Sequence, residues 1–122
     1  MKRLDYADMV IDYESGLIWE DSTRAVTQIN DTFDAPQICQ NLNLGGNTNW
    51  RVPTITELKT ILDEKRKKPA IKRVFKNCAN GNYLTSREVM KNSSSSWVID
   101  FNYGTEGFSP ANAPIYLRCV KN

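Results

Sequence analysis

The most uneven chemistry in the sequence is a run of positive side chains in its second half. Residues 65–76 hold seven of the 16 Lys and Arg residues and no acid: Lys65, Arg66, Lys67, Lys68, Lys72, Arg73 and Lys76. The other nine cations face 14 Asp and Glu residues, so the rest of the chain is acidic although the net charge is only +2. Cations without neighbouring acids create a positive local potential, and guanidinium groups bind sulfate or carboxylate through paired hydrogen bonds. This basic segment is therefore a candidate polyanion-binding surface, with a solvated helix end and loop as the alternative.

The residue types that common catalytic sites need are scarce. Histidine is absent, which excludes Ser-His-Asp and Cys-His catalysis and every zinc site that contains histidine. The close acid pairs are Glu20 with Asp21 and Asp31 with Asp34. Nothing in their neighbourhood predicts an apolar wall that would raise a pKa, so we expect solvated loop charges. The sequence predicts no catalytic residue, metal site or cofactor.

Three cysteines, Cys39, Cys78 and Cys119, are far apart and form no C-x-x-C pair. This spacing disfavours a metal site or a thioredoxin-type motif. One disulfide with a leftover thiol and three reduced thiols both remain open, and the former implies an oxidising compartment. Cys78 is either a reactive thiol whose pKa nearby lysines lower or an unreactive loop cysteine.

A second candidate binding feature is the pair Trp50 and Arg51. An indole face can stack on a sugar ring, and a guanidinium can hold an anion. Because the pair directly precedes a helix signal, we favour a structural role. Trp50 would then fill the core, and Arg51 would pair with Glu57 or Asp63. We expect Trp19 and Trp97, which lie in apolar runs, to be structural as well.

The helix signal after this pair is a capping box. Thr54 and Glu57 have the T-x-x-E spacing, and the preceding Pro53 blocks any earlier helix start. Apolar residues at helical spacing follow, so the sequence predicts a helix from about Thr54 to about Glu64.

The elements around these features alternate between strands and helices. A hairpin is expected from residues 9–13 and 17–19, and a first helix starts at Asp34 as N-cap and ends at Gly45-Gly46. Three more strand-like runs cover residues 83–86, 97–101 and 115–120, with Ser93–Ser96 at a hairpin tip. This order predicts an α+β fold with two helices packed on short antiparallel strands.

The length of 122 residues with 40% hydrophobic content predicts one domain, residues 1–122. No apolar run is long enough for a membrane span, and Met1-Lys2-Arg3 is not followed by a signal-peptide core. A signal or anchor region would lie outside this chain.

Several motifs occur in an order that resembles the bacterial Lcl C-terminal domain family, named after the C-terminal domain of the Legionella collagen-like adhesin. They are Leu17-Ile18-Trp19, a helix with Cys39, Gly45-Gly46, Trp50-Arg51-Val52-Pro53-Thr54 with Glu57-Leu58, Asn82-Tyr83-Leu84-Thr85-Ser86, Trp97-Val98-Ile99-Asp100-Phe101 and Leu117-Arg118-Cys119-Val120. The resemblance covers about Val10 to Val120. The chain departs from the family at Tyr83-Leu84, where an aromatic pair is usual, and at Ser15-Gly16, where Thr-Gly is commoner.

The resemblance implies a C-type-lectin-like architecture, similar also to formylglycine-generating enzymes. In that arrangement the first helix packs on the last strand, which implies a disulfide between Cys39 and Cys119 and leaves Cys78 free. The calcium motifs of sugar-binding C-type lectins are missing, so calcium-dependent sugar binding does not follow. The amide-rich residues 41–49 could serve calcium or a sugar, but we favour a polar connection between two helices.

The resemblance also implies a secreted, periplasmic or cell-surface recognition domain without enzyme activity. The expected partner is a glycan or polyanionic polysaccharide, as for adhesin members of the family, and no specific nucleic acid is expected. The alternative is a structural or protein-docking module that assembles as a homo-oligomer and has no small-molecule site.

Overall fold

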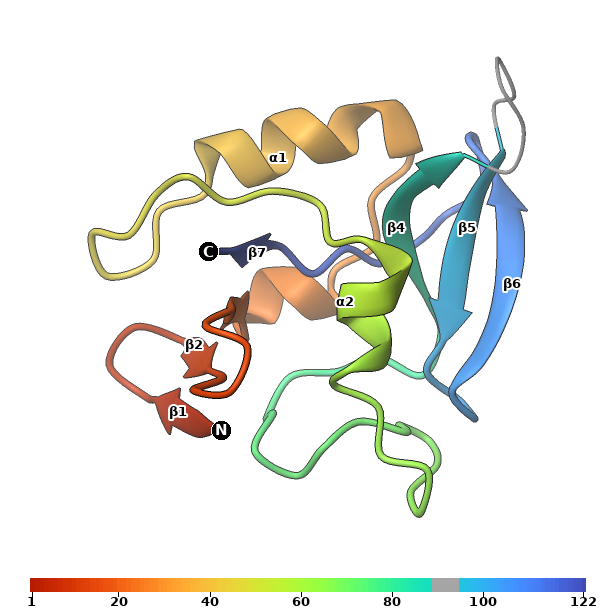
Figure 1. The fold of residues 1–122 in the computed structure, drawn as a ribbon. Coiled ribbons are helices and arrows are strands. Elements are labelled where there is room, and N and C mark those ends of the chain that lie inside the picture. Colours follow the sequence, from red (N-terminus) through yellow and green to blue (C-terminus); the bar gives the residue numbers. More distant parts are fainter. Residues whose placement is uncertain (89–94) are drawn as a thin grey trace.

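The computed structural model describes residues 1–88 and 95–122, in which the strands form two antiparallel sheets (Figure 1). The first sheet has the order β1-β2-β3-β7. Its strands are β1 (Lys2–Leu4), β2 (Met9–Ile11), β3 (Ile18–Glu20) and β7 (Val120–Lys121). The pairing of β2 with β3 confirms the predicted hairpin. This sheet brings the first and last strands of the chain into one layer.

The second sheet has the order β4-β5-β6, with β4 (Asn82–Glu88), β5 (Ser95–Asp100) and β6 (Thr105–Pro110). The sequence predicted β4 and β5 but not β6, whose residues are mostly exposed and contain Gly and Pro. Of the predicted hairpin tip Ser93–Ser96, the last two residues belong to β5 and the first two lie outside the described residues.

Side chains of the second sheet alternate between two core clusters, as expected for strands with both faces covered. Leu84 and Val98 belong to a cluster that includes residues of α1 (Ala35–Asn41). Their neighbours Tyr83 and Ile99 belong to a second cluster that includes Leu58 of α2 (Ile55–Lys59). The coarse prediction of two helices packed on short antiparallel strands is therefore confirmed.

The start and end of the first helix differ from the prediction. A short 3-10 helix, η2 (Thr32–Asp34), precedes α1, and Asp31 caps it by accepting from the Phe33 N–H at 2.9 Å. Asp34 makes no side-chain cap, so its expected role is wrong. The helix ends at Asn41, before Gly45-Gly46, because the Leu42 backbone is already extended.

The second helix begins as predicted but is shorter. After Lys59 the chain tightens into i to i+3 bonds, such as that from the Ile61 N–H to the Leu58 carbonyl. Leu62 then bridges Ile71, which turns the chain away from the helix axis. Residues 60–64, which the sequence predicted to be helical, therefore lie outside the helix.

The predicted strand at residues 115–120 is mostly irregular. Ile115 bridges Ile29 and Tyr116 bridges Tyr83, so successive residues pair with different neighbours and a regular ladder forms only at β7. No helix within residues 1–88 and 95–122 has the length and apolar character required to cross a bilayer.

Candidate functional site

The basic segment is a loop whose apolar residues are buried and whose cations face outward. Ala70, Ile71 and Phe75 are at most 7% exposed, and the last two pack in the same cluster as α2. The exposed cations are Lys65, Lys67, Lys68, Lys72, Arg73 and Lys76. Arg66 is half-buried, and its Nε has no hydrogen-bond partner in the described part of the chain. The buried residues therefore hold the loop against the core while most charges remain in solvent.

The middle of this loop is attached to the turn between β5 and β6. The Lys68 N–H donates to the Asn102 carbonyl at 2.8 Å, and the Ala70 N–H donates to the Phe101 carbonyl at 2.7 Å. Gly104 in the turn has a φ of +79°, and a Cβ there would lie 3.4 Å from Leu62 Cδ2. A side chain at this position would be strained and crowded, so glycine allows the turn to sit close to the loop.

The end of the basic segment is held by the buried carboxylate of Asp21, which is 0% exposed. Its two oxygens accept from the backbone N–H groups of Lys76 at 2.8 Å and Asn77 at 2.9 Å. The same carboxylate accepts from Arg3 Nε at 2.6 Å and Arg118 Nη1 at 3.3 Å. Because these donors belong to distant parts of the chain, Asp21 ties the N-terminal sheet to the end of the loop.

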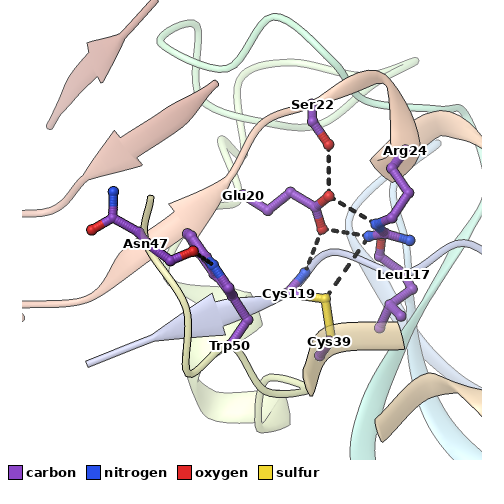
Figure 2. Close-up of a disulfide and its surroundings, with 8 residues drawn as sticks. All are labelled: Glu20, Ser22, Arg24, Cys39, Asn47, Trp50, Leu117 and Cys119. Carbon is purple, nitrogen blue, oxygen red and sulfur yellow. Dashed lines mark hydrogen bonds and ion pairs between the residues drawn. A yellow bond between two sulfur atoms is a disulfide. The ribbon is translucent and has the colours of Figure 1, made fainter. Parts of the chain in front are cut away.

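Glu20 is also 0% exposed and lies beside the disulfide (Figure 2). Its carboxylate accepts from Ser22 Oγ at 2.6 Å, from Arg24 Nε at 2.8 Å and from the Cys119 N–H at 3.0 Å. The expectation that Glu20 and Asp21 are solvated loop charges is therefore wrong. Each is buried because other parts of the protein supply enough donors to replace water.

The disulfide joins Cys39 of α1 to Cys119, with a Cα separation of 5.6 Å. This pairing confirms what the family resemblance implied, and Cys78 remains unpaired. The Cys78 thiol is half-buried, and burial raises its pKa. Lysines do not activate it, since the Lys76 ammonium lies 3.1 Å from Asp5 Oδ1 instead. The raised pKa is opposite in direction to the lysine-lowered pKa that the reactive-thiol interpretation assumed.

Trp50 is a core residue and not a surface platform. It is 2% exposed and packs in the same cluster as the disulfide. Its Nε1 donates to the Asn47 carbonyl at 2.9 Å (Figure 2). The amide-rich residues 41–49 also bond among themselves, with Asn43 Oδ1 accepting from the Gly46 N–H at 2.9 Å. They form the polar connection that we favoured.

Arg51 is occupied by an internal partner. Its two terminal nitrogens donate to the two carboxylate oxygens of Glu57, each at 2.7 Å, and one also donates to Asn122 Oδ1 at 2.6 Å. Arg51 lowers the pKa of Glu57 through these bonds. The predicted capping box is present, because Thr54 Oγ1 accepts from the Glu57 N–H and Glu57 Oε1 accepts from the Thr54 N–H. Pro53 before it is buried.

The positive charge is not balanced evenly along the basic segment. Lys76 is paired with Asp5, whose pKa it lowers. Lys72 is one of the residues that line a surface hollow, and the acids Asp12 and Glu14 line the same hollow. Lys65, Arg66, Lys67, Lys68 and Arg73 make no ion pair with the described residues. The excess charge is therefore concentrated at residues 65–68 and at Arg73.

One exposed aromatic residue beside this charge was not foreseen. The Lys68 Nζ lies 5.8 Å from the centre of the Tyr103 ring, and Tyr103 is 58% exposed. Residues 68 and 103 are far apart in the sequence, so no local pattern indicates their contact. The tertiary attachment of the loop to the turn between β5 and β6 creates it.

The model of the family described as the Lcl C-terminal domain matches residues 8–121. A search of curated proteins finds no match. Because the family match covers nearly the whole chain, this protein belongs to the Lcl C-terminal domain family.

Proposed function

We propose that this chain is a non-enzymatic, extracytoplasmic recognition domain that binds acidic glycans or another polyanionic surface through its basic segment. The observation that carries the proposal is the cluster at residues 65–68, where exposed cations have no acidic partner among the described residues. An uncompensated cluster keeps a strong local potential, which attracts polyanions and speeds their association.

The disulfide supports the proposed location. Bonds such as Cys39–Cys119 persist in oxidising compartments and are rare in reducing ones. A secreted, periplasmic or cell-surface protein fits this chemistry. We also propose that the two sheets and two helices are arranged as in C-type-lectin-like domains. The covalent attachment of α1 to the segment just before β7 supports this arrangement.

The state of the acidic residues supports a role without catalysis. Glu20 and Asp21 form the buried acid pair, and both are engaged by donors from the protein itself. A carboxylate held in this way is unable to approach a substrate unless the surrounding hydrogen bonds break. These residues therefore serve the fold.

The test is retention on a heparin column with two double variants that change the charge equally. Lys65→Ser with Lys67→Ser removes two exposed cations without acidic partners, whereas Lys72→Ser with Lys76→Ser removes two that lie near acids. We expect the wild type to bind at low salt and the first pair to lower the eluting salt concentration more than the second. Wild-type protein in the void volume would refute the proposal, and equal effects of the two pairs would refute its location at residues 65–68.

One observation favours the alternative, a protein-docking module. Phe108 of β6 is 68% exposed, and its ring meets that of Trp97 edge-on at 6.4 Å between centroids. Exposed aromatic residues of this kind are enriched at protein interfaces. Analytical ultracentrifugation together with a glycan panel separates the two functions, because a docking module assembles and ignores every glycan.

A further inference from the structure

The surface at residues 65–68 includes an aromatic ring as well as cations. Tyr103 lies in the turn between β5 and β6 with more than half of its surface in solvent. The Lys68 ammonium is 5.8 Å from its ring centre. An exposed ring next to a cation offers a ligand one apolar contact and one ionic contact at the same place.

The backbones of Lys68 and Tyr103 are held next to each other. Lys68 has a φ of +50°, which a lysine rarely adopts, and its N–H is bonded to the residue that precedes Tyr103. Gly104, which follows Tyr103, sits against Leu62 and Ala70. The loop and the turn therefore hold the backbones of Lys68 and Tyr103 side by side before any ligand binds, which lowers the ordering cost of binding.

We infer that this surface takes an acidic glycan, in which one sugar ring stacks on Tyr103 while the carboxylate or sulfate of that ring lies against Lys68. The inference rests on the proposed function and narrows its ligand class. The C–H groups on one face of a sugar ring are weakly positive and contact the negative face of an aromatic ring. An anionic substituent on the same sugar lies close enough to reach a neighbouring ammonium group.

Other polyanions fit the pair less well. A linear polyphosphate has the charge but no ring to stack on Tyr103. Single-stranded nucleic acids are bound by grooves that combine cations with several aromatic platforms for successive bases. Lys68 has a ring contact with Tyr103, whereas the Phe75 ring within the basic segment is buried and contacts Arg118. At residues 65–68, Tyr103 is the ring that the described part of the chain places against a cation, which favours a ligand with one stacked ring there.

The experiment compares a sulfated heparin oligosaccharide with linear polyphosphate of matched total charge, at one salt concentration, by titration calorimetry. We expect Tyr103→Ala to weaken heparin binding about fivefold, the upper range for one exposed cation–π or stacking contact. Polyphosphate affinity should change less than about twofold, because Tyr103 carries no charge. Tyr103→Phe should bind heparin like the wild type, since the ring is retained.

The control is Phe33→Ala, which removes another exposed ring. Phe33 is 71% exposed and lies in η2, directly before α1, whereas Figure 1 shows the loop of residues 65–76 at the opposite side of the molecule. It should leave both affinities unchanged. A circular dichroism melt of each variant checks that the fold is intact.

The outcomes separate the inference from the proposed function. If both polyanions bind and Tyr103→Ala affects them equally or not at all, the acidic-glycan inference is wrong and polyanion binding stands. If neither binds the wild type, both fail. Tighter binding of an oligothymidylate than of heparin, lost in Tyr103→Ala, would show that the ring stacks on bases instead.

Discussion

Two clusters of charge in this domain have opposite environments. Glu20, Asp21 and Arg118 are at most 1% exposed and are bonded to each other or to neighbouring groups. The cations of the basic segment are mostly exposed, and those at residues 65–68 make no ion pair with the described residues. Buried charges of the first kind are costly to disrupt, whereas exposed charges of the second kind contribute little to stability.

The difference separates charges that hold the fold of this nearly neutral chain from charges that remain available to a ligand. In the buried network, Arg118 donates to the Glu20 carbonyl at 2.6 Å and also to the Asn77 carbonyl, and its guanidinium lies 4.9 Å from the Phe75 ring centre. These contacts hold the C-terminal end of the basic segment against the buried network. The exposed cations of the segment remain in water, where a polyanion can reach them.

Among changes to buried groups, loss of the disulfide should lower the free energy of unfolding the most. Cys39→Ala with Cys119→Ala opens a loop with a sequence separation of 80 residues. The chain-entropy model assigns about 4.5 kcal/mol to such a closure. Urea unfolding of the double variant should show a loss of this order, and Cys78→Ala should change stability far less. A double variant as stable as the wild type would contradict a structural role for the bond.

Trp50→Ala should cost nearly as much, about 3 to 5 kcal/mol, because it deletes a large buried side chain in the same core cluster. Heparin affinity of the folded variant should be unchanged, since Trp50 belongs to one core cluster and the buried residues Ile71 and Phe75 of the basic segment belong to the other. An unchanged melting temperature with lost binding would mean that Trp50 is a ligand residue after all.

Asp21→Asn should cost about 3 kcal/mol, as expected when one partner of a buried charge pair is removed. It also tests the link between the two clusters. Long-range electrostatics alone predicts tighter polyanion binding, because a negative charge is lost. We expect no such gain at a temperature where the variant is folded, because the bonds to the Lys76 and Asn77 N–H groups weaken and the loop end is released.

The matched control is Asp5→Asn, which makes the same charge change at an exposed carboxylate paired with Lys76. This variant should bind heparin more tightly with little loss of stability. If Asp21→Asn gained affinity as Asp5→Asn does, Asp21 would have no positioning effect on the loop.

Thr54→Ala should have a smaller effect on stability than the disulfide, Trp50 and Asp21 variants, about 1 kcal/mol from the loss of a helix cap. The partner Glu57 adds a dependence on pH. Because Arg51 lowers the pKa of Glu57 in the folded state, its contribution is complete above the unfolded value of about 4.3 and is lost as pH falls through the lower folded value. Unfolding curves of wild type and Glu57→Gln between pH 6 and pH 3, about the range in which carboxylates titrate, should converge as the pH falls. Parallel curves would contradict the ion pair.

Local patterns predicted a large part of this fold. The capping box, the first hairpin and the positions of β4 and β5 depend on residues close in sequence, and all three are present. The strand β6 was missed because its exposed Gly- and Pro-containing sequence lacks the alternation of a buried strand. The early end of α2 was missed because it depends on the bridge between Leu62 and Ile71, a contact between residues nine positions apart that the helical spacing of apolar residues does not indicate.

The candidate site was predicted only in part, because tertiary contacts that no local pattern indicates also shape it. The cation run is visible in the sequence, but the contact of Lys68 with Tyr103 depends on how the loop docks on the second sheet. The burial of Asp21 depends on donors such as Arg118, which is 97 positions away. Glu20 pairs with Arg24 four positions away, but this spacing is typical of exposed pairs on helices and does not indicate burial.

The most direct test of the separation between fold and recognition is one variant measured in two ways. Lys65→Ser, Arg66→Ser, Lys67→Ser and Lys68→Ser are combined, and heparin affinity across a salt series is determined alongside urea unfolding. We expect affinity to fall by more than about tenfold with a shallower salt dependence, since fewer charges are screened. The free energy of unfolding should change by less than about 1 kcal/mol. A variant that binds as well as the wild type, or that loses binding only because it unfolds, would contradict the account.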